Sequence, residues 1–153
     1  MIILIISYRE RLPVLLPELD KQKCRDNARE VLKQYRRKAR IAGQPLTTLK
    51  SPTASDMPKA VSVDNSMEQK YIDAISANQD INYMLRAFQS IRQINFQVLY
   101  YTYLDKEVHT DLEISSIVFH SLNAIKTVER RRSEALIEFC EAYRHGELLV
   151  YKK

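Results

Sequence analysis

Glycine is scarce in this chain: its 153 residues include 2 glycines, 5 prolines and no tryptophan. A turn-rich sheet protein needs many more glycines and prolines, so the composition argues against an all-β fold. It also argues against a glycine-rich phosphate-binding loop. Leucine, isoleucine, alanine, arginine, glutamate and lysine are abundant, and these residues favour helices. The composition therefore predicts an all-α protein.

Cysteine and histidine are also rare. Cys24 and Cys140 lie far apart, without CxxC spacing, so we expect two buried free thiols in a reducing compartment. The three histidines are scattered, and no His/Cys/Asp cluster has the spacing of a metal site. We therefore predict no metal, no cofactor and no enzymatic activity. One acidic cluster could suggest a two-metal nuclease, but helix capping explains two of its four carboxylates. The four residues are Asp105, Glu107, Asp111 and Glu113.

Long hydrophobic runs are missing as well. The apolar stretch at residues 1–8 is too short to span a bilayer, has no basic flank before it and no small-residue cleavage site after it. We therefore expect neither a signal peptide nor a membrane anchor, and we predict a cytoplasmic protein.

Positive charge is concentrated in one segment. The formal net charge is +5, and residues 21–50 contribute ten lysines and arginines against two acidic residues, a net +8. The remaining residues therefore sum to −3. A segment this basic is typical of contact with nucleic acid; a solvated helix, or a helix that docks on a partner protein, is the alternative.

A single amphipathic helix is predicted over this basic segment. Asp20 is a suitable N-cap, apolar residues recur every three or four positions after it, and Gly43 ends the pattern. The face opposite the apolar stripe is cationic and can follow DNA phosphates. We predict DNA contact by Arg25, Arg29, Lys33, Arg36, Arg37 and Arg40.

A linker is predicted after this helix. Residues 44–65 contain three prolines, many serines and threonines and little periodicity. We therefore divide the chain into a tethered N-terminal arm (1–43), a linker (44–65) and a helical domain (66–153). Within that domain, a capping box from Ser66 to Gln69 predicts the start of a long helix that lies inside the domain. Asn95 is expected to cap the next helix.

Residues 110–145 have the pattern of a helix-turn-helix. Thr110 and Glu113 form a capping box, so a first helix should start at Thr110. Small Ser115 stands where such motifs need a close helix approach, and Phe119 stands where many of them have glycine. The buried face of this helix is expected to consist of Leu112, Ile114, Ile117 and Val118.

A second helix is predicted from an N-cap at Ser121 to Gly146, with Ile125 and Val128 buried. An N-cap at Asn123 is the alternative, and it would lengthen the turn.

The exposed face near the start of this helix carries residue types that read base edges or bind phosphates. Arg132 falls on the inner face, where we expect it to pair with Glu129 or Glu113. The alternative is an ordinary solvated helix surface in a bundle. The residues that we predict to contact DNA here are Ser121, Asn123, Lys126, Thr127, Arg130 and Arg131.

The chain resembles the ArpU family of phage and prophage transcriptional regulators from Gram-positive bacteria, which is related in style to the late-gene activator RinA. The resemblance covers nearly the whole chain, and its most specific stretch is EALIEFCEAYRHGELLVYK. The stretches that carry it are 16–37, 55–69, 110–114 and 134–152.

This resemblance implies a C-terminal unit similar to region four of sigma factors, with Thr127, Val128 and Arg130 in its recognition helix. It further implies an activator that binds double-stranded DNA at promoters of late packaging or lysis genes, at the nucleoid of a bacterial host. Host RNA polymerase and a second copy of the chain are further candidate partners. The alternative from another functional class is an assembly or adaptor protein, such as a small packaging subunit or a polymerase-docking factor.

Overall fold

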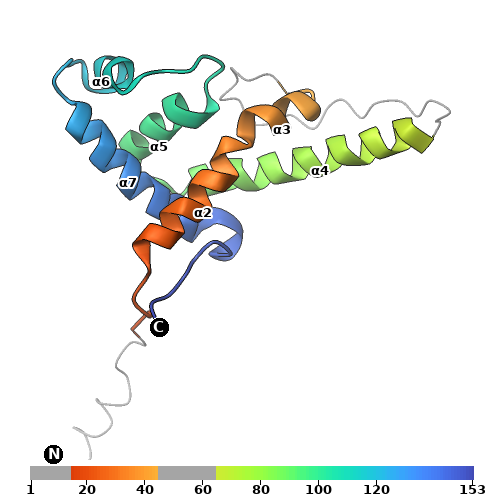
Figure 1. The fold of residues 1–153 in the computed structure, drawn as a ribbon, viewed down its shortest axis with the longest axis horizontal. Coiled ribbons are helices and arrows are strands. Elements are labelled where there is room, and N and C mark those ends of the chain that lie inside the picture. Colours follow the sequence, from red (N-terminus) through yellow and green to blue (C-terminus); the bar gives the residue numbers. More distant parts are fainter. Residues whose placement is uncertain (1–14, 45–64) are drawn as a thin grey trace, which may run out of the picture.

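The structure is a computed structural model, and it describes residues 15–44 and 65–153. These residues form helices and no strand, which confirms the all-α prediction (Figure 1). The elements in chain order are α2 (Lys21–Lys33), α3 (Tyr35–Ile41), α4 (Asn65–Phe88), α5 (Gln93–Leu99), the π-helix η1 (Tyr100–Leu104), α6 (Asp111–Phe119), α7 (Ile125–Ala142) and the 3₁₀-helix η2 (Tyr143–His145).

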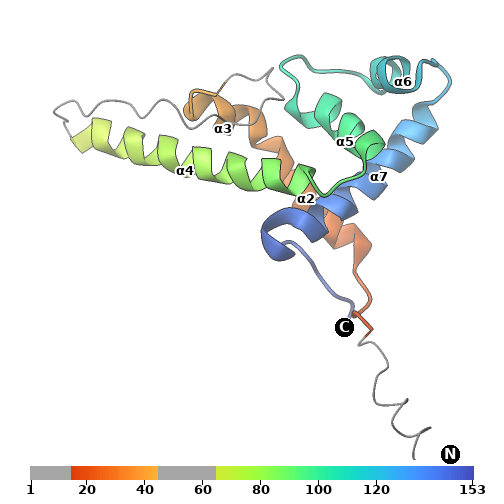
Figure 2. The ribbon, with the colours of Figure 1, turned by 180° about the vertical axis from the view of Figure 1, so that it is seen from behind.

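Helix α7 lies at the centre of the fold and packs against α2, α4, α5 and α6. Seen from behind, α5 and α6 lie at the N-terminal end of α7, while α2 crosses nearer its C-terminal end (Figure 2). The main core takes Leu32 from α2, Met84 from α4, Leu99 from α5 and Phe139 from α7. A smaller cluster joins α5, α6 and α7 through Val98, Ile114 and Val128.

The N-terminal basic segment is built into this core. The side chain of Asp20 accepts a hydrogen bond from the Lys23 backbone N–H, which confirms the predicted N-cap. The expected single helix is interrupted at Gln34, between α2 and α3. Most of its apolar face is buried, so the prediction of an arm tethered apart from the rest is corrected. The buried side chains are Cys24, Ala28, Leu32, Tyr35 and Ala39. Most of the predicted linker, residues 45–64, lies outside the described residues.

Residues 148–152 pair with α2 and with the residues just before it. The backbone N–H of Asp20 donates to the Val150 carbonyl at 2.8 Å, and that of Lys152 donates to the Glu18 carbonyl at 2.9 Å. Leu19 and Tyr151 form an isolated antiparallel β-bridge. The amide of Asn27 on α2 donates to the Leu148 carbonyl at 3.1 Å. Segments at opposite ends of the described sequence are therefore paired.

A tight turn brings these last residues back onto α2. Helix α7 ends at Ala142, earlier than the predicted Gly146, and Arg144, His145 and Gly146 all have positive φ. A Cβ at Gly146 would lie 2.8 Å from Cδ1 of Leu149, which the flexible end of that side chain can relieve, so glycine is needed there mainly for its positive φ of 84°.

Helix α4 is buried along its second half only. Ala77, Ile81 and Met84 are in the core, whereas Met67 and Ile75 are 56% and 48% exposed. The first turns of α4 extend away from the other helices (Figure 1). The expectation that the whole helix lies inside the domain is therefore wrong. Its start is also earlier than expected, since the helix already includes Asn65.

Asn95 does not cap α5. The helix begins at Gln93, after Arg92, and Asn95 is fully buried within it. The tyrosine-rich stretch that follows forms the π-helix η1, and Tyr100 packs on Phe96 at a ring-centroid distance of 6.2 Å. In the part of the chain that is described, no helix is long and apolar enough to cross a membrane.

Candidate nucleic-acid interface

The capping box at the start of α6 is present as predicted. The backbone N–H of Glu113 donates to Oγ1 of Thr110 at 3.3 Å, and the Thr110 N–H donates to Oε2 of Glu113 at 2.7 Å. That backbone hydrogen bond lowers the pKa of Glu113. The N-terminus of α6 is thus fixed by residues three positions apart.

Five residues, 120–124, separate α6 from α7. His120 adopts the left-handed conformation, with φ 53° and ψ 32°. The turn therefore begins at His120, one residue after Phe119, which stands where many such motifs have glycine. The fully buried hydroxyl of Ser115 donates to the Ser121 carbonyl and accepts the Ala124 backbone N–H at 3.1 Å. Ser115 therefore fixes the turn by hydrogen bonding. The sequence pattern indicates only that this residue is small.

Helix α7 starts later than predicted. Its N-cap position is Ala124, so the N-cap predicted at Ser121 and the alternative at Asn123 are both wrong. The hydroxyl of Ser121 instead accepts the Asn123 N–H at 3.2 Å. The N-cap position of α7 makes no side-chain hydrogen bond to the helix, so N–H groups of its first turn have no side-chain cap there.

The apolar side chains of this unit are less buried than expected. Ile114 and Val128 are fully buried, as predicted. Leu112 and Ile117 are 47% and 40% exposed, and Ile125 is also exposed, so these three burial predictions are wrong. A small apolar contact therefore holds α6 to its neighbours.

The predicted contact residues at the start of α7 divide into two groups. Asn123, Lys126 and Arg130 are exposed, and the last two are four residues apart, so they share one helix face. Thr127 and Arg131 are half-buried on another face. Nη1 of Arg131 lies 3.3 Å from Oε2 of Glu134, and Arg131 Nε is buried without a partner among the described residues. Ser121 is half-buried in the turn.

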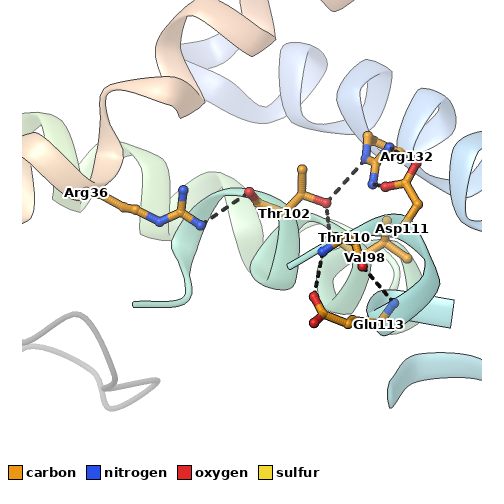
Figure 3. Close-up of polar contacts among 7 residues, drawn as sticks. All are labelled: Arg36, Val98, Thr102, Thr110, Asp111, Glu113 and Arg132. Carbon is orange, nitrogen blue, oxygen red and sulfur yellow. Dashed lines mark hydrogen bonds and ion pairs between the residues drawn. The ribbon is translucent and has the colours of Figure 1, made fainter. Parts of the chain in front are cut away.

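Arg132 points inward, as predicted, but with another partner. Its guanidinium pairs with both carboxylate oxygens of Asp111, the first residue of α6, rather than with Glu129 or Glu113. Its Nε donates to Oγ1 of Thr102 at 3.3 Å (Figure 3).

The cations of α2 and α3 are partly used inside the protein. Nε of Arg36 donates to the Asp105 carbonyl at 2.7 Å, and its Nη2 donates to the carbonyls of Thr102 and Glu107. Arg36 is therefore withdrawn from the candidate interface, which corrects its predicted placement. Arg29 pairs with Asp26 at 2.7 Å.

The remaining cations of this segment differ in exposure. Lys33 pairs with Glu30 at 3.2 Å but remains exposed, and Arg25 is half-buried with its Nε enclosed. Arg37 and Arg40 are exposed. Lys33, Arg37 and Arg40 are thus the most accessible of the predicted contacts on these helices.

The two cysteines and most of the acidic cluster make contacts within the protein. Cys24 and Cys140 are both buried and free, as expected, and burial together with the neighbouring Cys24 thiol raises the pKa of Cys140 to about 12. In the acidic cluster, Asp105 lies beside His109, while Asp111 and Glu113 have the partners given above. The described residues contain no group of His, Cys, Asp and Glu side chains suited to hold a metal ion.

Comparison with known proteins gives one strong similarity. No family model matches the chain, and no solved structure matches it. The chain is 39% identical over 138 residues to a protein of Enterococcus hirae named "Putative autolysin regulatory protein ArpU", covering 90% of this chain and 98% of that protein. The chain belongs to the ArpU family. The printed name of this relative describes a regulatory protein.

Proposed function

We propose that this ArpU-family chain is a transcriptional regulator that binds double-stranded DNA in a sequence-specific way and activates late packaging or lysis genes of a phage or prophage. One observation carries the proposal. Asn123 in the turn before α7, and Lys126 and Arg130 on its first two turns, are exposed to solvent, while Val128 and Leu136 on the other face of α7 are fully buried. A helix fixed in this way can enter a DNA groove without losing its place in the core.

In this proposal α6 and α7 form a helix-turn-helix similar to that of sigma-factor region four, and α7 is the recognition helix. The major groove is about 12 Å wide and admits an α-helix. Asn123 is suited to adenine and Arg130 to guanine, because each can make two hydrogen bonds to the base edge. Lys126, Thr127 and the N–H groups that no side chain caps are suited to phosphate oxygens.

Helices α2 and α3 supply a second basic surface. Lys33, Arg37 and Arg40 are exposed there, with Arg25 and Arg29 beside them. Because α2 packs on α7, this surface is fixed relative to the recognition helix. In this proposal a duplex that contacts both surfaces does so in a single geometry, rather than through a mobile arm.

The regulatory part of the proposal rests on the relative, whose printed name describes an autolysin regulatory protein. An activator of this type acts at the nucleoid and contacts host RNA polymerase. A homodimer would place two recognition helices on two half-sites of one operator.

Selection of duplexes from a randomised pool, followed by mobility-shift measurement over a range of salt concentrations, tests DNA recognition. A regulator is expected to bind a selected duplex at least a thousandfold more tightly than a scrambled duplex of equal composition. Equal, salt-sensitive binding to both duplexes would contradict sequence recognition. A reporter gene placed downstream of the selected site then shows whether transcription rises with the protein.

A second candidate function is an assembly or adaptor role, and one observation favours it. The first half of α4 exposes Met67, Ile72 and Ile75 on a helix that extends from the core. Exposed apolar side chains of this kind often contact another protein. The mass in solution separates the two candidates: a large closed ring supports a packaging subunit, whereas a monomer or dimer supports the regulator.

A further inference from the structure

Arg132 joins three elements of the fold at one point. It lies on α7, pairs through two nitrogens with Asp111 at the start of α6, and donates from its third nitrogen to the hydroxyl of Thr102 in η1. Its side chain is 18% exposed, and that of Asp111 is 37% exposed. Two parallel N–H···O bonds between a guanidinium and a carboxylate fix angle as well as distance.

Thr102 receives a second arginine from another helix. Its hydroxyl donates to the Val98 carbonyl at 2.6 Å and accepts Arg132, while its own carbonyl accepts Nη2 of Arg36 at 3.3 Å (Figure 3). Thr102 lies in a π-helix, where backbone carbonyls lack their usual α-helical partners. The two basic helices α3 and α7 are thus both hydrogen-bonded to one residue.

Helix α6 depends on such polar contacts because few of its apolar side chains are buried. Ile114 is the one large side chain of α6 that is fully buried, and Leu112 and Ile117 are exposed. Ser115, at the middle of α6, holds this helix to the turn that follows it, and Arg132 holds its N-terminal end through Asp111.

We propose that Arg132 is a positioning residue for DNA recognition. Acting through Asp111 and Thr102, it sets the angle between α6 and α7, and thereby the angle at which Asn123 and Arg130 meet a base pair. This inference rests on the proposed DNA-binding function. In this inference Arg132 acts without touching DNA, since each of its three guanidinium nitrogens is hydrogen-bonded within the protein and its side chain is mostly buried.

The test compares Arg132→Met with Arg144→Met in the full chain. Both changes remove one positive charge, but Arg144 lies on the ring of Tyr83 and pairs with Glu147, away from α6 and η1. The probes are a duplex selected by the wild-type protein and a scrambled duplex of the same composition. Arg132→Met is expected to lower the ratio of selected to scrambled affinity by about tenfold. Binding to scrambled DNA and its salt dependence should stay unchanged, and Arg144→Met should change neither quantity.

Two results would overturn the inference. An unchanged ratio would show that the angle of α7 does not depend on Arg132. A fall in affinity for the scrambled duplex would show that Arg132 contacts a phosphate directly, if the salt slope also falls in magnitude by about 0.9. The salt slope is the slope of the logarithm of the binding constant plotted against the logarithm of the salt concentration.

A second substitution serves as a control, so that the result does not depend on the folding of one variant alone. Asp111→Asn keeps the shape of the side chain and removes its charge, and Asp111 is not among the predicted DNA contacts. It should lower the ratio in the same way, and the double variant should lose little more than either single variant, because both changes break one interaction. Additive losses would contradict action through Asp111. If the wild-type protein selects no duplex, the proposed function itself fails, and a loss confined to the variants cannot be mistaken for that result.

Discussion

Helices α2 and α7 both carry several cations and both bury an apolar face in the same core, yet they use their charges differently. Along α2 and α3, Arg36 is bonded to backbone carbonyls and Arg29 and Lys33 are paired with acids of their own helix. On the first two turns of α7, Lys126 and Arg130 are exposed and have no ion pair among the described residues. The segment with the larger net charge therefore has fewer unengaged cations than its sequence suggests.

This contrast shows why net charge alone does not locate a DNA-contacting surface. A guanidinium can bind a phosphate only if its donors are not already used within the protein. On α3, the donors of Arg36 hold the end of η1. On α7, the inward Arg132 is used in the same way, whereas Arg130, two residues earlier, is not.

The largest expected effect tests whether α2 is a structural helix. Leu32→Ala should reduce the free energy of unfolding by about 2–5 kcal/mol, because it opens a cavity in a fully buried site. Urea denaturation measures this change. The adjacent exposed Lys33→Ala is the matched control and should stay within about 0.5 kcal/mol of the wild type. A similarly small effect at Leu32 would restore the interpretation of a tethered arm.

The second effect concerns the exposed cation of α7. Arg130→Ala should weaken binding to a selected duplex by about 1–3 kcal/mol and relax specificity at one base pair, if Arg130 reads a guanine. Competition between selected and single-substituted duplexes measures the loss. Retained discrimination at every position would rule out a base contact by this residue.

The third effect concerns a cation that is already engaged. Arg36→Met should lower the free energy of unfolding by about 1–3 kcal/mol, because carbonyls of Thr102 and Asp105 lose a charged donor. Its DNA-binding salt slope should match that of the wild type. A reduced slope with unchanged stability would instead place Arg36 on a phosphate.

The fourth effect is smaller and concerns an exposed cation of α3. Arg40→Ala should leave stability within about 0.5 kcal/mol of the wild type and reduce the salt slope of DNA binding by about 0.9. Mobility shifts at several salt concentrations give the slope. The pair Arg36 and Arg40 thus separates an internal role from a surface role within one helix.

The smallest effect at neutral pH concerns the thiols that join α2 and α7. Since burial and Cys24 raise the pKa of Cys140 to about 12, its thiol stays protonated in the folded protein and should resist alkylation at pH 8. A raised folded-state pKa gives stability that is complete below the unfolded-state pKa, near 9, and that decreases as the pH rises toward 12. Thermal unfolding from pH 7 to 11 measures this decrease, and Cys140→Ala should flatten it. Rapid alkylation of the native protein at pH 8 would contradict a buried, protonated thiol.

Sequence reasoning predicts local features of this protein better than distant ones. The helix starts after Asp20 and Thr110 are correct, because each cap depends on a residue three positions away. The cap expected at Ser121 is wrong, since the turn is fixed by Ser115 in the preceding helix. Asn95 has the residue type of an N-cap, but tertiary packing buries it inside α5.

The candidate interface follows the same rule. The exposure of Lys126 and Arg130 could be predicted from helical periodicity, because the buried residues that define the opposite face of α7 are close to them in sequence. The engagement of Arg36 could not, because its acceptors lie 66 to 71 residues further along the chain. The Asp111 partner of Arg132 is 21 residues away, and only the packing of α6 against α7 brings it near.

The pairing of α2 with the last residues also determines when this protein can finish folding. Cys24 and Val150 are 126 residues apart, and the Asp20 N–H meets its acceptor on that same Val150. At about 5–20 residues per second, a ribosome needs on the order of ten seconds to make the chain between them. During that interval α2 has no C-terminal partner, and neither does its cysteine-bearing apolar face. Of the described helices, the one that is synthesised first is thus completed last, and the newly made chain is most exposed to chaperones and proteases before residues 148–152 emerge.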